Sequence, residues 1–173
     1  MKSFSSLQSL YQMEKKKHIY TEQEAYQKLS ALCAMSEQCC HDVMMKMKRW
    51  EVAQEVAEKM VARLVKERFI DEERFARAFV RDKFRYNHWG RVKIELELRK
   101  KKIAQRHIEM GMEELQEEDN LNTLRELIQK KRPSVKGKNE YEIRGKLIRF
   151  ALGRGFQMDD IVKVVGDLDE CID

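Results

Sequence analysis

The segment Ile94-Glu-Leu-Glu-Leu-Arg-Lys-Lys-Lys-Ile103 indicates a repeat architecture, because its apolar pattern occurs in two other places in the chain. Its anchors Ile94, Leu98 and Ile103 are four and then five residues apart, so the first two share one face of a helix. Counting 51 residues back or 53 residues forward from Leu98 reaches anchors with the same spacing. These are Val43, Met47 and Val52 before it, and Leu147, Ala151 and Phe156 after it. Self-similarity of this kind predicts three copies of one structural unit.

Each anchor set is followed and preceded by further apolar residues at helical spacing. The following ones are Ala57, Val61 and Leu64; Ile108, Met112 and Leu115; and Ile161, Val165 and Leu168. The preceding ones are Ala25, Leu29 and Leu32; Phe75, Phe79 and Val80; and Leu121, Leu124, Leu127 and Ile128. Each unit is therefore predicted to consist of three helices.

A unit of about 50 residues buries too little surface to be stable alone, so we expect the three units to pack in a row. The predicted fold class is all-α, an elongated tandem array of three three-helix, helix-turn-helix-like repeats. The expected repeats are residues 21–68, 69–118 and 119–173, the last with an acidic tail. Residues 1–20 are expected to form a mobile N-terminal arm.

Local signals mark where several helices begin. Thr21, three residues before Glu24, predicts a capping box. Asp71 and Asn120 are each expected to cap the N-terminus of a helix, since their side chains can accept bonds from free N–H groups.

Turn-forming residues are scarce, with seven glycines and one proline in 173 residues. This scarcity excludes a β-sandwich or barrel, which needs many tight turns. Gly90, between two helices of the second unit, is expected to have a positive φ, and Gly155 is expected at the matching helix end in the third unit. Pro133 marks the longest loop, inside the third unit.

Charge is arranged in blocks around a net charge of +5. Residues 81–107 and 125–154 each carry +7, whereas residues 109–119 carry −6 and residues 159–173 carry −5. Alternating blocks favour an anionic partner, together with a feature that restrains binding to it. The acidic stretch 109–119 could repel or mimic DNA, or its end at 116–119 could be a solubilising linker, and the tail from Asp167 could be autoinhibitory.

The chain lacks the marks of membrane and secreted proteins. No apolar run approaches the ~20 residues of a membrane-spanning helix, and the early lysines follow the apolar residues instead of preceding them. Its four cysteines show no disulfide-framework spacing. We expect a cytoplasmic protein.

Three stretches carry a recognisable pattern, namely Phe69-Ile-Asp-Glu-Glu-Arg-Phe-Ala-Arg-Ala-Phe79, then Trp89-Gly-Arg-Val-Lys-Ile-Glu-Leu-Glu-Leu-Arg-Lys-Lys-Lys-Ile103, and Lys146-Leu-Ile-Arg-Phe-Ala-Leu-Gly-Arg-Gly-Phe156. They resemble the RecX family. The residues that carry the motif are Phe69, Ile70, Asp71, Phe75, Ala76, Phe79, Gly90, Ile94, Leu98, Gly155 and Phe156. One departure is that the family's basic-Gly turn is Lys101-Lys102 in the second unit and Arg49-Trp50 in the first, without glycine.

The resemblance implies a regulator of RecA, the recombinase that coats single-stranded DNA. RecX-like proteins lie along the RecA–DNA filament, limit its extension, ATPase and strand exchange, and act in recombination, DNA repair and the SOS response. The resemblance therefore implies a protein that is not an enzyme. We also expect no cofactor or metal, a monomer as the binding unit, and weak affinity for single-stranded DNA alone.

Two basic sets are the candidates for binding RecA or DNA. The first is Arg85, Arg91, Lys93, Arg99, Lys100, Lys101, Lys102 and Arg106, and the second is Lys130, Lys131, Arg132, Lys136, Lys138, Arg144, Lys146 and Arg149. Arg99, Lys102 and Arg106 are expected on one helix face, where they could follow phosphates. The alternative is a solvated face that keeps the protein soluble. Among the neighbouring aromatic residues, Trp89 is expected to pack at the helix junction, and Tyr86 could stack on a base.

Catalytic and metal-binding patterns are missing from the sequence. Cys39-Cys40-His41 lacks the paired spacing of a zinc site, and the acidic run at 71–73 begins a helix. No Gly-x-x-x-x-Gly-Lys-Ser/Thr loop is present. Besides the RecA regulator, two functions stay open: a stand-alone helical nucleic-acid-binding module, and a scaffold that binds proteins through helical grooves.

Overall fold

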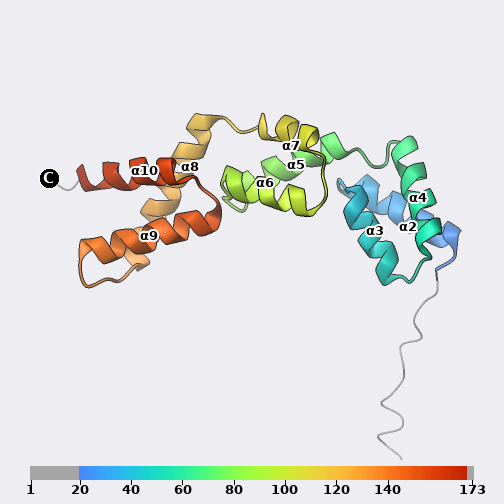
Figure 1. Cartoon of the computed structure of the whole chain (residues 1–173), viewed down its shortest axis with the longest axis horizontal. Helices are drawn as coiled ribbons and strands as arrows, with labels where there is room; N and C mark the ends of the chain where they lie inside the picture. Colours follow the sequence, from blue (N-terminus) through green and yellow to red (C-terminus); the bar gives the residue numbers. More distant parts are fainter. Residues whose placement is uncertain (1–19, 171–173) are drawn as a thin grey trace, which may run out of the picture.

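The computed structural model describes residues 20–170, in which every regular element is helical and no strand occurs. The first repeat consists of α2 (Glu22–Met35), α3 (Cys40–Arg49) and α4 (Gln54–Lys66). The second consists of α5 (Glu72–Arg85), α6 (Arg91–Lys100) and α7 (Gln105–Met112). The third consists of α8 (Glu117–Lys131), the short 3-10 helix η1 (Arg132–Ser134), α9 (Glu140–Arg154) and α10 (Met158–Glu170). The repeats follow one another along the long axis (Figure 1), which confirms the predicted elongated array.

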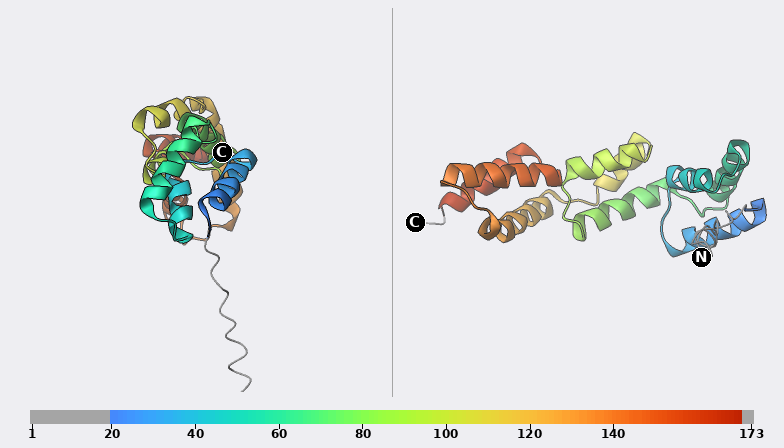
Figure 2. Two further views of the ribbon diagram at one scale, coloured as in Figure 1. Left: turned by 90° about the vertical axis from the view of Figure 1, so that its right-hand side faces the viewer. Right: turned by 90° about the horizontal axis from the view of Figure 1, so that it is seen from below.

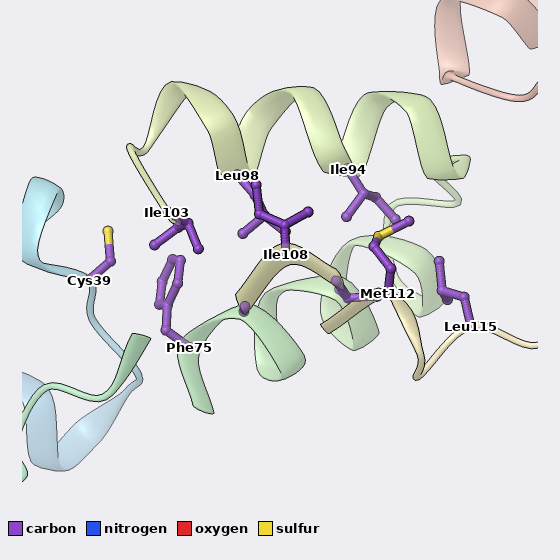
Figure 3. Close-up of a cluster of buried hydrophobic side chains, with 10 residues drawn as sticks. Cys39, Phe75, Ile94, Leu98, Ile103, Ile108, Met112 and Leu115 are labelled. Carbon is purple, nitrogen blue, oxygen red and sulfur yellow. The ribbon is translucent and has the colours of Figure 1, made fainter. Parts of the chain in front are cut away.

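Each repeat has its own apolar core, built on the predicted anchors. The second core gathers its anchors Ile94, Leu98 and Ile103 with Phe75 of α5 (Figure 3). In the first repeat Val52 is only half-buried, and in the third all three anchors are buried. Three small cores in series explain why neighbouring repeats must also contact each other to be stable.

The second helix of every repeat ends in the same left-handed turn. Its φ is positive at Glu51 (58°), Lys102 (59°) and Gly155 (87°), three equivalent positions. Two backbone bonds close each turn: the positive-φ residue donates to the carbonyl three residues back, and the next residue donates to the carbonyl five residues back. The turn in the first repeat therefore centres on Glu51, one residue beyond the expected Arg49-Trp50.

Lys102→Gly is expected to stabilise the protein by roughly 1 kcal/mol, because a side chain at positive φ is strained and glycine is not. The matched control is Lys100→Gly, in the last turn of α6, where glycine should cost about 1 kcal/mol. Urea unfolding followed by circular dichroism measures both changes. A loss of stability in Lys102→Gly would contradict this account of the turn.

Three sequence predictions about local geometry are wrong. Gly90 has φ −78° and precedes α6, so its role is close packing and not a left-handed turn. Asn120 lies inside α8, whose N-terminal cap position is Gln116, and residues 117–119 form helix instead of linker. Asn120 is buried and its amide donates to Asp160 Oδ2 at 3.1 Å, so it joins α8 to α10. The caps at Thr21 and Asp71 are confirmed.

Repeats 2 and 3 are joined through their backbones. The N-terminus of α6 meets the C-terminus of α9, where Gly90 N–H donates to the Arg154 carbonyl (2.9 Å) and Val92 N–H donates to the Gly155 carbonyl (3.1 Å). A Cβ at position 90 would lie 2.4 Å from the Gly155 oxygen, so this approach requires glycine. Head-to-tail contact also aligns the dipoles of the two helices favourably.

Repeats 1 and 2 meet at the equivalent ends, through side chains. The N-terminus of α3 faces the C-terminus of α6, and Lys101 Nζ lies 2.5 Å from Asp42 Oδ2. Cys39, which occupies the position equivalent to Gly90, packs into the core of the second repeat (Figure 3). Arg74 Nε lies 2.6 Å from Glu37 Oε1 across the same junction. As a result α9, α6 and α3 run one after another along the whole molecule (Figure 2).

Some expectations fall outside the described residues. The N-terminal arm does so except for Tyr20, and so do Cys171 and the end of the acidic tail. Within residues 20–170, none of the helices combines the length and the apolar character that crossing a membrane would require.

Candidate functional site

The first basic set is divided between the repeat junctions and the surface. Lys93 Nζ donates to the Gly153 carbonyl (3.3 Å), and Arg91 donates to the Leu115 carbonyl (3.0 Å). With Lys101 bound to Asp42, three of the eight candidates help to hold the fold together. Each of these three side chains is partly buried.

Four further bases of the first set lie near the turn between α6 and α7. Arg99 pairs with Glu95 (2.6 Å) and Lys100 with Glu97 (2.7 Å), whereas Lys102 and Arg106 are exposed. The predicted common helix face of Arg99, Lys102 and Arg106 is wrong, because α6 ends at Lys100 and Arg106 belongs to α7. The three still surround one turn, since Arg99 Nη2 reaches Gln105 Oε1 (3.4 Å) at the start of α7.

Arg85 lies at the opposite end of the second repeat, at the C-terminus of α5, and is exposed beside Tyr86. Tyr86 is 78 % exposed, so its ring is open to a partner. Trp89 instead packs against the second core, with Lys83 Nζ and Lys93 Nζ 5.4 and 4.6 Å from its ring centre. This packing agrees with the structural role expected for Trp89.

The second basic set surrounds the loop between η1 and α9. Lys146 Nζ donates to the Lys136 carbonyl and to Glu142 Oε1, both at 2.7 Å. Lys138 N–H donates to Glu142 Oε2 (2.9 Å), and these donors hold the pKa of Glu142 below its usual value. The loop is thereby fastened to α9, and the side chains of Lys136 and Lys138 are exposed.

The remaining members of the second set lie on α8, η1 and α9. Lys130 pairs with Glu126 (3.3 Å) and Arg132 with Glu140 (2.8 Å). Lys131 Nζ lies 5.4 Å from the ring centre of Phe150. The other two members, both on α9, are Arg144, which is half-buried, and Arg149, which is exposed.

Part of the acidic block contacts bases of its own repeat. Glu114 lies 3.0 Å from Arg77 and 3.6 Å from Arg81, and Glu113 lies 3.6 Å from Arg77. These pairs join α5 to the end of α7, so the two glutamates act within the fold.

The thiols of Cys39 and Cys40 are not activated as nucleophiles. Burial raises the pKa of Cys39 to about 11, and burial together with Glu72 raises that of Cys40 to about 12. Both thiols are therefore protonated at neutral pH, whereas the thiolate is the reactive nucleophile. Among residues 20–170, no cluster of His, Cys, Asp and Glu side chains is arranged to hold a metal ion.

A groove of about 680 Å³ lies where repeats 1 and 2 meet, and the sequence did not predict it. Met44 and Met45 of α3 belong to its apolar lining, as do Val52 and Ala57. Three lysines and two glutamates also line it, namely Lys48, Lys101, Lys102, Glu51 and Glu72. Flexible methionines are common at surfaces that bind proteins. The available signal was the pair of adjacent methionines beside the anchor Met47.

Comparison with known proteins identifies the family. A family model described as "RecX, second three-helix domain" matches residues 71–112, and one described as "RecX, third three-helix domain" matches residues 117–165. The regulatory protein RecX of Prosthecochloris aestuarii is 32 % identical over 123 residues, which cover 71 % of this chain and 79 % of that protein. The chain belongs to the RecX family. Its relatives are named as regulatory proteins, so this is a family of regulators and not of enzymes.

Further RecX proteins agree in sequence and fold. The Clostridium acetobutylicum regulatory protein RecX is 26 % identical over 131 residues, which cover 73 % of this chain and 60 % of that protein. The crystal structure of RecX from Lactobacillus salivarius superposes with a TM-score of 0.71 at 18 % identity, covering 86 % of this chain and 96 % of that one. A second crystal structure of a regulatory protein RecX superposes with a TM-score of 0.75 at 17 % identity, covering 96 % of this chain and 79 % of that one. These likenesses show that the fold is the tandem three-helix array of RecX.

Proposed function

We propose that this protein binds the RecA–single-stranded DNA filament and inhibits its extension, ATPase and strand exchange, and so regulates recombination and DNA repair. Membership of the RecX family of regulators carries the proposal. The proposal includes a cytoplasmic location and a single copy as the binding unit.

The elongated array of repeats is suited to binding a long partner that is itself built from repeating subunits. Exposed bases occur in more than one repeat, with Lys102 and Arg106 in the second and Lys136 and Lys138 in the third. Each such contact is weak in water at physiological salt. Linking the repeats raises the effective concentration of each later contact once the first has formed, so a filament is bound far better than an isolated short anion.

Charge reversal at the α6–α7 turn tests this electrostatic contribution. Lys102→Glu with Arg106→Glu should weaken binding to the filament about tenfold or more. If each base neutralises one phosphate of single-stranded DNA, the slope of log binding constant against log salt concentration should also become less steep by roughly 1.4. Cosedimentation with RecA filaments at several salt concentrations measures both quantities.

The matched control reverses two exposed bases of α4, Lys59→Glu with Lys66→Glu, which changes the net charge equally. The control should bind almost as well as the wild type. Equal losses of filament affinity in both double variants would show that only net charge matters, and that the α6–α7 turn makes no specific contact with the filament. Tight, sequence-selective binding to bare DNA without RecA would instead favour the stand-alone nucleic-acid-binding module.

A further inference from the structure

The second helices of the three repeats carry the same exposed surface. Position 45 of α3 is equivalent to 96 of α6 and 149 of α9, and position 48 is equivalent to 99 and 152, by the offsets that relate the anchors. All six residues at these positions are exposed: Met45 and Lys48, Leu96 and Arg99, and Arg149 and Leu152. We call this set the second-helix row.

Each repeat contributes one aliphatic residue and one base to the row, a turn apart. Met45, Leu96 and Leu152 are 39 %, 50 % and 42 % exposed. An isolated exposed aliphatic residue is ordinary on a protein surface. Here Met45 and Leu96 occupy equivalent positions and Leu152 occupies the other position of the row, so every repeat places one exposed aliphatic residue on the same pair of positions. No acidic residue occupies any of the six positions.

The row extends along the molecule because its helices are joined end to end. The backbone bonds from Gly90 and Val92 tie α6 to α9, and the Lys101–Asp42 ion pair ties α6 to α3. Figures 1 and 2 show the three helices following one another along the long axis. Next to the row, the methionine-lined groove between repeats 1 and 2 adds a hollow that can take an anchoring side chain.

The chemistry of the row favours a protein over a nucleic acid. Aliphatic side chains neither neutralise phosphates nor stack on bases as aromatic rings do. Aliphatic residues alternating with bases complement a protein surface in which apolar residues lie beside carboxylates. A nucleic acid would leave the three aliphatic residues without a matching contact.

From these observations we infer that the second-helix row is the surface that docks on protein, and that its occupant is an acidic, partly apolar face of the filament's protein subunits. This inference rests on the proposed function and deepens it, because it separates a protein-binding row from the bases that meet DNA. Binding through the row then follows the subunits of the filament and does not depend on the DNA sequence.

Leu96→Asp tests the row, because it places a carboxylate against an acidic, apolar partner surface. Binding of the full-length variant to RecA filaments should weaken about tenfold or more, while its binding to bare single-stranded DNA should stay within about twofold of the wild type. The control is Val65→Asp, since Val65 is 45 % exposed but lies on α4, outside the row. Cosedimentation measures filament binding, fluorescence anisotropy measures DNA binding, and thermal melting confirms that the variants fold.

Met45→Asp applies the same test to the first repeat. It should also weaken binding to RecA filaments while leaving the affinity for bare single-stranded DNA nearly unchanged. The inference is overturned if Leu96→Asp and Met45→Asp bind filaments like the wild type. It is equally overturned if Val65→Asp loses as much filament affinity as these two variants. It is also overturned if filament and bare-DNA affinities fall together, because the row would then be a DNA surface. Failure of the wild-type protein to bind filaments would instead reject the proposed function itself, and the row with it.

Discussion

Gly90→Ala is expected to separate repeats 2 and 3. The added methyl would lie 2.4 Å from the oxygen and 2.5 Å from the carbonyl carbon of Gly155, and both are backbone atoms that cannot rotate away. Relief requires the helix ends to move apart, which breaks the two inter-repeat bonds donated by Gly90 and Val92. Two hydrogen bonds at about 1 kcal/mol each, together with overpacking of 1–3 kcal/mol, give a loss of about 3–5 kcal/mol.

Gly153→Ala is the matched control for this change. Gly153 lies in the last turn of α9, two residues from Gly155, and a Cβ there would meet no atom within 4 Å. Alanine in a helix is favoured over glycine by roughly 0.5–1 kcal/mol, so the control should be slightly more stable than the wild type. Urea unfolding followed by circular dichroism compares the variants, and a wild-type midpoint in Gly90→Ala would refute the described junction.

Leu98→Ala is expected to cost about 2–5 kcal/mol of unfolding free energy. Leu98 is fully buried in the second core, where the surrounding side chains cannot fill the space left by truncation (Figure 3). Such a loss is a large fraction of the 5–15 kcal/mol that stabilises an ordinary domain. Because the second repeat joins the other two, we expect the loss to weaken the whole array.

Leu96→Ala, two residues away on the same helix, provides the comparison. Leu96 is half exposed and outside the core cluster, so its truncation should change stability by less than about 1 kcal/mol. Thermal and urea unfolding of the two variants should therefore differ clearly. Similar losses in both would mean that the face of α6 assigned to the core is wrong.

The sequence predicted the repeat and its core well, because both depend on apolar spacing within short segments. The equivalent spacing around Met47, Leu98 and Ala151 is enough to identify all three second helices, and all three residues are buried. Thr21 and Asp71 were also predictable, since a cap needs only neighbouring residues. Asn120 was mispredicted because its partner, Asp160, is 40 residues away and draws the side chain into a buried contact.

The candidate site was harder to predict because charge counts do not reveal partners. Lys101 counts toward a basic block, yet it binds Asp42 across a repeat junction 59 residues away in sequence. Glu114 likewise counts toward an acidic block while pairing with Arg77. The second-helix row became visible only when the structure showed that Met45, Leu96 and Leu152 are exposed on helices joined end to end.

The DNA-dependent ATPase of RecA shows whether this protein acts on RecA filaments, as we propose. The assay adds increasing amounts of the full-length protein to RecA on single-stranded DNA, with filament length followed in parallel by electron microscopy. We expect a dose-dependent fall in ATPase rate and shorter filaments, with Lys102→Glu/Arg106→Glu less effective than the wild type. An unchanged ATPase rate and unchanged filament length at several-fold excess over RecA would reject the proposed function.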